Sequence, residues 1–253
     1  TRRFGGVVAV DAVDLDVVAG EVLGLVGQNG AGKTTLLDCI SGFLPVDAGV
    51  IRLGGDELTD APPHLRARAG LGRSFQEARL FPSLSVVETV AVACERHVRN
   101  PTMVADALRQ PASFEAELDT ARRVGELVDL LGLRAHAHKL TSELSTGMRR
   151  IVELACLLAA EPKVLLLDEP SAGVAQRETE ALGPLLVQIR DRTGAALVVI
   201  EHDMPLLSSI CDRMVALELG RVIAEGSPEE VLADERVVAS WLGTDESAIA
   251  RAG

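Results

Sequence analysis

Short apolar runs, separated by glycines and charged residues, open the chain and return in its last third. Most of them are rich in valine and leucine, as is typical of strands buried on both faces of a parallel sheet. The predicted strands are Val7–Val10, Val13–Val18, Val22–Val26, Ala48–Leu53, Val164–Leu167 and Ala195–Ile200, with a hairpin formed by Met214–Leu219 and Arg221–Ala224.

Helical patterns follow several of these strands. We expect a helix from about Lys33 to Ser41, directly after a glycine-rich loop, and another over Arg177–Arg192, allowing a kink at Pro184. Residues Ser227 to Glu230 form a capping box, with serine at N-cap, proline at N1 and glutamate at N3. This box predicts a short C-terminal helix.

The middle of the chain lacks strand-like runs. Its clearest signal is an apolar stripe at i, i+3, i+4 and i+7, which predicts one buried face of a helix. The stripe consists of Val124, Leu127, Val128 and Leu131. We therefore expect a mainly helical subdomain at residues 77–158, inserted into an α/β core made of residues 1–76 and 159–253.

Composition narrows the class of protein. Of the 253 residues 47% are apolar, enough for a buried core, and only 2% are aromatic, so that core is aliphatic. The formal net charge is −12, whereas proteins that grip nucleic-acid backbones are usually basic, so no nucleic-acid partner is expected. The same acidity disfavours direct docking on anionic lipid.

Three further features of the sequence each lead to one expectation. Cysteines 39, 94, 156 and 211 are widely spaced, include no CxxC pair and sit in apolar contexts, which argues against a zinc site. No apolar run approaches the roughly 20 residues of a membrane span, and no signal-peptide pattern is present. The sequence starts at Thr1 without an initiator methionine, so we expect a trimmed chain or a piece of a longer one.

The loop after Val26 matches G-x-x-x-x-G-K-[ST] throughout. Glycines let successive N–H groups point at phosphate oxygens, and the following helix directs its positive N-terminus at the same anion. Lys33 should reach the β- and γ-phosphates, and the Thr34 hydroxyl should coordinate Mg²⁺. A glycine turn before an ordinary helix is the alternative, but the flanking apolar strand and helix favour a nucleotide site. Its expected residues are Gly27, Asn29, Gly30, Ala31, Gly32, Lys33, Thr34 and Thr35.

The strand Val164–Leu167 ends in two acids, Asp168 and Glu169. In phosphoryl-transfer enzymes a buried strand of this kind places the first acid where it holds Mg²⁺, and the second can contact the attacking water. A strand that ends in ordinary solvated acids is the alternative, but the presence of the phosphate-binding loop in the same chain favours the metal-binding interpretation. The sequence therefore predicts an α/β fold with a P-loop NTPase core, in which helices flank a mixed sheet.

Further segments, in a fixed order, resemble the ATP-binding subunits of ABC transporters. Leu144–Arg150 resembles the signature motif of that family, usually written LSGGQ, and Gln76 matches its Q-loop glutamine. His202 stands where the family has its switch histidine, and Phe4 where it has an aromatic residue that stacks on adenine. Because the ordered set spans nearly the whole chain, residues 1–253 resemble a single ABC nucleotide-binding domain with an inserted helical ABC subdomain.

The resemblance implies a mechanism in which two such domains pack head to tail around ATP and Mg²⁺. Ser145 and Gly147 would then contact the γ-phosphate held by the second domain. Glu169 would be the catalytic base, His202 would hold the γ-phosphate and the water, and Gln76 would sense Mg²⁺. The implied metal set is Thr34, Gln76 and Asp168.

Each implied role has an ordinary alternative. Ser145 has the sequence context of a plain helix N-cap, and a lone histidine after a strand is often only a polar surface residue. A solvated loop amide is the alternative for Gln76, and a strand-edge hydrophobe is the alternative for Phe4. The order of the motifs along the chain favours the functional interpretation of each.

Four segments make the resemblance more specific. They look like the ATP subunits of branched-chain amino acid importers, which have close relatives in urea importers and lipopolysaccharide exporters. The segments are Ser74–Gln76, Arg79–Phe81, Glu201–Met204 and Trp241–Gly243. The resemblance implies transmembrane permease subunits, a substrate-binding protein and a place on the cytoplasmic face of the membrane. We hypothesise that Leu80–Pro82 contacts a permease helix; the alternative is packing within the helical subdomain.

The chain also departs from the family pattern. Thr146 and Met148 replace the first glycine and the glutamine of the signature, and the strand that usually precedes Phe4 is missing. Ser171–Ala175 lacks the aspartate that usually couples the two sites of a dimer, which puts that coupling in doubt.

Two other functions remain as alternatives. A non-transport ABC ATPase for DNA repair, translation or cofactor assembly would usually carry a long coiled coil or a second domain with basic linkers, and neither is present. A module that binds ATP without hydrolysing it is disfavoured by Glu169 and His202.

Overall fold

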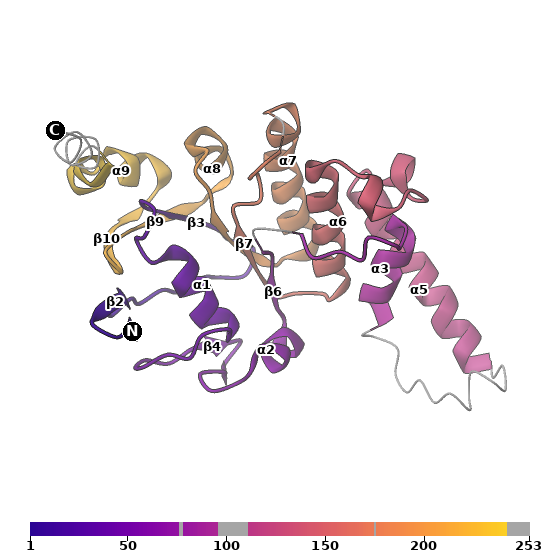
Figure 1. The fold of residues 1–253 in the computed structure, drawn as a ribbon, viewed down its shortest axis with the longest axis horizontal. Helices are drawn as coiled ribbons and strands as arrows, with labels where there is room; N and C mark the ends of the chain where they lie inside the picture. Colours follow the sequence, from indigo (N-terminus) through magenta and orange to yellow (C-terminus); the bar gives the residue numbers. More distant parts are fainter. Residues whose placement is uncertain (76–77, 96–110, 175, 242–253) are drawn as a thin grey trace.

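The computed structural model describes residues 1–75, 78–95, 111–174 and 176–241, and in these residues one mixed six-stranded sheet forms the centre (Figure 1). Across the sheet the strands are β10 (Arg221–Gly226), β9 (Arg213–Glu218), β3 (Val22–Val26), β8 (Ala196–Ile200), β7 (Val164–Asp168) and β6 (Leu71–Arg73). All neighbours pair in parallel except β9 and β10, which form the predicted hairpin. The predicted α/β class with a mixed sheet is confirmed.

Helices cover both faces of this sheet (Figure 1). They are α1 (Lys33–Ser41), α2 (Pro63–Ala69), α3 (Val86–Cys94), α5 (Pro111–Leu130), α6 (Thr146–Ala159), α7 (Gln176–Thr193), α8 (Met204–Ile210) and α9 (Pro228–Ala233), with 3-10 turns at Arg134–His136 and Thr141–Glu143. On the α1 face, Leu37 packs with Leu23 and Leu25 of β3. Val22 and Val26 belong to the cluster on the other face, with α7 and α8. Because alternate side chains of β3 enter two apolar clusters, the strand is apolar throughout.

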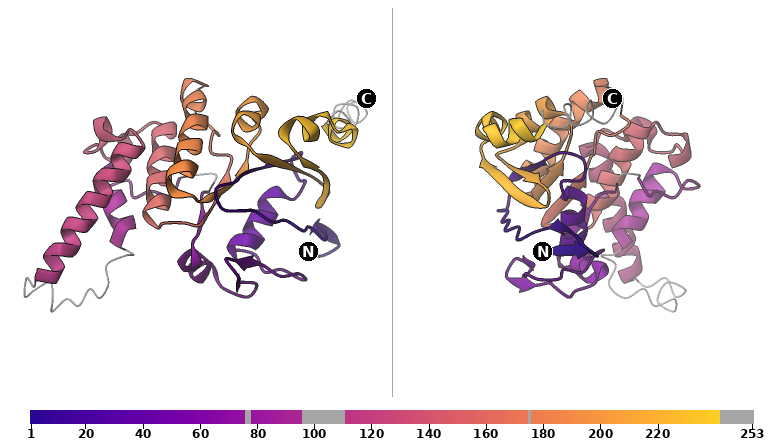
Figure 2. Two further views of the ribbon diagram at one scale, coloured as in Figure 1. Left: turned by 180° about the vertical axis from the view of Figure 1, so that it is seen from behind. Right: turned by 60° about the vertical axis from the view of Figure 1, so that its left-hand side comes forward.

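Helices α3, α5 and α6 pack against one another at one end of the molecule (Figure 2). The stripe predicted from the sequence is buried there, with exposed fractions of 5% to 9% for Val124, Leu127, Val128 and Leu131. The helix that carries the stripe is therefore confirmed. The serine-led capping box of α9 is also present, with Ser227 accepting from the N–H of Glu230.

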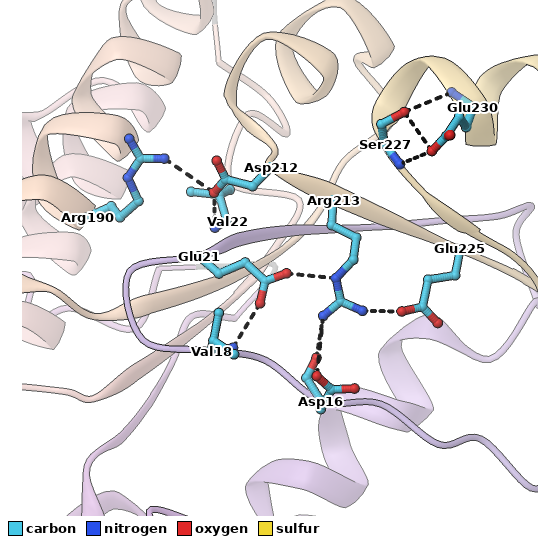
Figure 3. A network of polar contacts seen from close by, with 10 residues as sticks. All are labelled: Asp16, Val18, Glu21, Val22, Arg190, Asp212, Arg213, Glu225, Ser227 and Glu230. Carbon is cyan, nitrogen blue, oxygen red and sulfur yellow. Dashed lines mark hydrogen bonds and ion pairs between the residues drawn. The ribbon is translucent and has the colours of Figure 1, made fainter.

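The predicted strand Val13–Val18 is wrong. The segment is extended and has alternating burial, with Val13, Leu15 and Val17 packed on the core, but it pairs with no strand among the described residues. Side chains bind its backbone instead: Arg213 of β9 donates to the Asp16 carbonyl (2.6 Å), and the Val18 N–H donates to a Glu21 carboxylate oxygen (2.8 Å), as Figure 3 shows. The alternation of apolar and polar residues therefore indicates alternate burial of side chains in this segment, and it does not indicate pairing with another strand.

Several short elements also differ from expectation. Of the predicted strand Ala48–Leu53 only β4 (Arg52–Leu53) forms, paired with β5 (Asp56–Glu57). Neither α2 nor β6, whose three residues include a glycine and an arginine, was predicted. A small hairpin of β1 (Arg2–Phe4) and β2 (Val7–Val10) precedes the core, so Phe4 lies on a strand.

Candidate active site

The loop between β3 and α1 depends on its glycines. Gly27, Gly30 and Gly32 have φ values of 143°, 85° and 104°, which glycine adopts without steric cost. A Cβ added at Gly27 would lie 2.2 Å from the carbonyl oxygen of Leu217, and one at Gly32 would lie 2.3 Å from that of Ala9. Because both neighbours are backbone atoms, glycine is required for space as well as for conformation.

Lys33 folds back into this loop. Its side chain is buried, and Nζ donates hydrogen bonds to the carbonyl oxygens of Gly27 (2.5 Å) and Gln28 (2.9 Å). Burial lowers the pKa of Lys33, while the carboxylates of Glu169 and Asp168 oppose that shift. The loop thus concentrates positive charge beside two acids that lie far away in the sequence.

Asp168 is held at the end of β7, which is separated from β3 by β8 alone. Its N–H donates to Ser74 Oγ (3.0 Å), and its Oδ2 pairs with Arg73 Nη2 at 3.2 Å. Burial raises the pKa of Asp168, and the Arg73 charge and a hydrogen bond from Thr34 oppose the rise. Parallel strands have therefore brought Asp168 to the loop that carries Lys33 and Thr34, as the sequence predicted.

The same carboxylate fits a divalent metal ion. Asp168 Oδ1 is buried and has no hydrogen-bond partner within the part of the chain that the structure describes. The Thr34 side chain lies beside this carboxylate. Carboxylate and hydroxyl oxygens are the hard ligands that Mg²⁺ accepts, so these two residues suit that ion.

Glu169 and His202 are in direct contact, although 33 positions separate them. His202 Nε2 lies 3.0 Å from Glu169 Oε1, and the Glu169 side chain is 26% exposed. Glu169 has a φ of 50°, a left-handed conformation that costs a non-glycine residue about 1 kcal/mol or more. Its N–H donates to the Ile200 carbonyl (3.0 Å), which holds this conformation against β8. Strain of this kind is common where a side chain must point at a ligand.

A cleft of about 490 Å³ lies between the glycine loop and His202. This volume is within the usual range for small-molecule sites. Its lining residues are Gly27, Gln28, Asn29, Glu201, His202, Met204 and Trp241.

Glu201 is a residue of the site that sequence reasoning left without a role. It is 3% exposed, and its carboxylate accepts hydrogen bonds from the Ser171 N–H (2.7 Å), the Ser171 hydroxyl (2.8 Å) and the His202 N–H (3.2 Å). It therefore joins the turn after Glu169 to the histidine. An acid directly before a histidine at the end of a buried strand was the available signal.

Replacing Glu201 by glutamine should lower ATPase turnover by about tenfold, because the amide cannot accept from all three donors and one charge-assisted hydrogen bond is lost. Nucleotide affinity should stay unchanged, since Glu201 holds Ser171 and His202 but not the glycine loop. Steady-state kinetics against a Glu235→Gln control, an exposed acid on the surface, check this. Equal turnover in the two variants would contradict it.

The signature residues lie on a different element. Ser145 caps α6, accepting from the Met148 N–H at 3.2 Å, and Gly147 is buried in the first turn. A Cβ added at Gly173 would lie 3.6 Å from Thr146 Cγ2, so the turn after Glu169 approaches the start of α6. Ser145 and Gly147 thus belong to the start of α6, and Lys33 belongs to the start of α1.

Phe4 and Gln76 were also predicted as site residues. Phe4 is 44% exposed, with the Arg2 guanidinium 4.8 Å from the centre of its ring. Gln76 lies outside the described residues. Its neighbour Phe75 is described, and both its backbone groups are bound by α6: the N–H donates to Glu153 (3.3 Å), and the carbonyl accepts from Arg150.

A mainly parallel sheet whose strand ends bring together a glycine loop, a buried aspartate suited to a metal ion and a Glu–His pair defines the class of P-loop nucleotide hydrolases. Residues 10–172 match the family model "ABC transporter", and residues 221–247 match "Branched-chain amino acid ATP-binding cassette transporter". The chain belongs to the ABC transporter family, as an ATP-hydrolysing subunit.

Individual relatives are similar over nearly their whole length. The branched-chain amino acid transport ATP-binding protein BraF of Pseudomonas aeruginosa is 36% identical, covering 96% of this chain and 95% of BraF. The lipopolysaccharide export ATP-binding protein LptB of Escherichia coli K12 is 35% identical, covering 96% and 95%. The solved ATP-binding cassette MJ1267 of an ABC transporter superposes with a TM-score of 0.81 at 26% identity, covering 95% of each chain.

Among the described residues, no helix combines enough length with enough apolar character to cross a membrane.

Proposed function

We propose that this subunit powers the import of branched-chain amino acids or of a similar small polar solute. The observation that carries the proposal is the match of residues 221–247 to the branched-chain amino acid transporter model, because this segment lies outside the ATPase motifs that all ABC proteins share. The likeness to BraF over nearly the whole chain supports it.

The glycine loop and Lys33 bind the phosphates of ATP. Burial of Lys33 among carbonyl oxygens supports this role, because an ammonium held there is placed for an anion entering the loop. Thr34 and Asp168 hold Mg²⁺, which neutralises charge on the phosphates when bound, and Gln76 completes the metal set. The other phosphate-contacting residues are Gly27, Asn29, Gly30, Ala31, Gly32 and Thr35.

Glu169 positions and deprotonates the attacking water, and His202 orients Glu169 through the 3.0 Å contact. Phosphoryl transfer needs mainly positioning and charge stabilisation, so a strained, fixed carboxylate is well suited to the task. Phe4 stacks on the adenine, and its exposure on β1 leaves one face of its ring available.

Ser145 and Gly147 act on a second copy of the domain. They begin α6, where the positive end of the helix dipole favours an anion. A head-to-tail dimer is the arrangement that supplies each γ-phosphate with both the start of α6 and the loop that holds Lys33. We divide the chain functionally into a core of residues 1–76 and 159–253 and a helical subdomain of residues 77–158.

The helical subdomain connects the subunit to a permease at the cytoplasmic face of the membrane, and a substrate-binding protein delivers the solute. Phe81 supports this proposal: its side chain is 55% exposed, while its carbonyl is fixed by the Thr141 hydroxyl at 2.6 Å. Its neighbour Leu80 packs inward against the core. An exposed aromatic side chain on a fixed backbone is a typical interface anchor.

Phe81→Asp should weaken association with the permease subunits by about tenfold or more, because it places a charge in an apolar contact. Leu118→Asp, at an equally exposed position (55%) on α5, is the matched control. The test co-purifies each variant with permeases encoded by neighbouring genes and measures stimulation of the ATPase by leucine-loaded binding protein. Unchanged association in Phe81→Asp would count against this surface, and stimulation by lipopolysaccharide instead would favour an exporter.

The likeness to LptB makes export of lipid or lipopolysaccharide the second candidate. A soluble ABC ATPase without a permease is a third. Both share the ATPase site, so they differ from the proposed importer in the partner and the stimulating solute.

A further inference from the structure

Arg73, the last residue of β6, lies between the P-loop helix and the end of β7. Its side chain is 6% exposed. Nη2 contacts Asp168 Oδ2 at 3.2 Å and Asp38 Oδ1 at 2.9 Å, and Nη1 donates to Ser41 Oγ at 3.4 Å. One guanidinium thus joins three elements that carry the site.

The spacing along α1 explains this contact. Thr34, Asp38 and Ser41 stand at i, i+4 and i+7, so they share the face of α1 that meets β6 and β7. Arg73 binds the last two directly, and Asp38 lies one helical turn from Thr34. Without Arg73, the partly exposed Asp38 and the buried Asp168 would be two nearby like charges with no guanidinium between them.

Arg73 also makes the two carboxylate oxygens of Asp168 different from each other. Oδ2 is occupied by the guanidinium, whereas Oδ1 is buried and has no partner among the residues described by the structure. Oδ1 is therefore the atom directed to a metal ion. A free divalent cation that approaches it meets two positive side chains, Arg73 and Lys33, whose charges offset much of the attraction of Asp168, Asp38 and Glu169.

We propose that Arg73 is a positioning residue that orients Asp168 for the metal and keeps free divalent cations from binding before nucleotide arrives. The proposal rests on the proposed metal role of Asp168. Divalent metal then enters the site together with ATP, whose phosphates bring the negative charge that the arginine opposes.

The test measures Mn²⁺ binding to the nucleotide-free protein by electron paramagnetic resonance. Arg73→Gln should bind Mn²⁺ about tenfold more tightly than the wild type or better, because a unit charge is removed from beside the metal. The gain should vanish in Arg73→Gln/Asp168→Asn. Arg79→Gln, at an exposed arginine stacked 4.7 Å from the Phe75 ring, is the control and should match the wild type.

Equal nucleotide-free Mn²⁺ affinity in Arg73→Gln and the wild type overturns the proposal. If the glutamine variant does not fold, Arg73→Lys replaces it: one compact ammonium cannot bridge both acids, so an affinity gain of about threefold is expected, and wild-type affinity overturns the proposal. Mn·ATP binding by the wild type, measured in parallel, tests the proposed metal site separately. Its failure would refute that site, while the nucleotide-free comparison would still decide the effect of Arg73.

Discussion

Glu169→Gln should reduce ATPase turnover by about a hundredfold or more while Mg·ATP binding persists. The substitution keeps size and shape but removes the carboxylate that accepts the proton of water, and a positioned general base contributes roughly this factor. The 3.0 Å contact with His202 can survive as a neutral hydrogen bond, so the local structure should be retained. Steady-state turnover and calorimetric ATP affinity are the two measurements.

Two comparisons make this result specific. Lys33→Ala should lose nucleotide affinity itself, because it removes the ammonium bound within the loop. Glu126→Gln, at an exposed acid on α5, should change neither quantity. Under the head-to-tail arrangement, ATP should also trap Glu169→Gln as a dimer on size exclusion. Turnover retained in Glu169→Gln would remove Glu169 from the catalytic role.

Arg66→Met should lower the free energy of unfolding by about 3 kcal/mol or more, the cost of leaving buried hydrogen-bonding groups without their charged partner. Arg66 is 2% exposed, and burial lowers its pKa. Its guanidinium donates to four backbone carbonyls, those of Cys39 (2.6 Å), Ile40 (2.7 Å), Thr59 (2.7 Å) and Ala61 (2.7 Å). Two of these end the P-loop helix, where a cation is favourable.

Chemical denaturation checks this prediction. Arg68→Met, an exposed arginine of the same helix, is the matched control and should change stability by less than about 0.5 kcal/mol. Arg66→Lys should be intermediate, because lysine keeps the charge but reaches fewer carbonyls. Equal stability of Arg66→Met and Arg68→Met would show that the carbonyls find other partners.

Local pattern was enough to predict the elements that bear the chemistry. The loop at Gly27, the helix Lys33–Ser41 and the strand that ends at Asp168 all follow from short apolar runs joined to motifs of fixed spacing. Parallel strands end at the same edge of the sheet, and this is why the position of Asp168 close to the loop was predictable. The roles of Gln76, Ser145, Gly147 and Phe4 depended on resemblance to a family and stay predictions.

The errors share a physical cause. Alternation along Val13–Val18 follows from packing on the core, and pairing depends on whether a partner strand lies alongside, which no local pattern encodes. The buried arginines were missed for a similar reason. Arg66 and Arg73 contact groups 27 and 95 positions away, so nothing near them in the sequence marks them as interior.

The amino-acid sequence was enough to predict the class of chemistry. The glycines and Lys33 act through local backbone geometry, and the two acids lie where a strand ends. The tertiary structure alone decided how that chemistry is supported: Arg73 across Asp168 and Asp38, Glu201 across Ser171 and His202. These contacts join segments that are far apart in the sequence and meet only in the folded chain. The partner of a buried charge therefore cannot be identified from the residues next to it in the sequence.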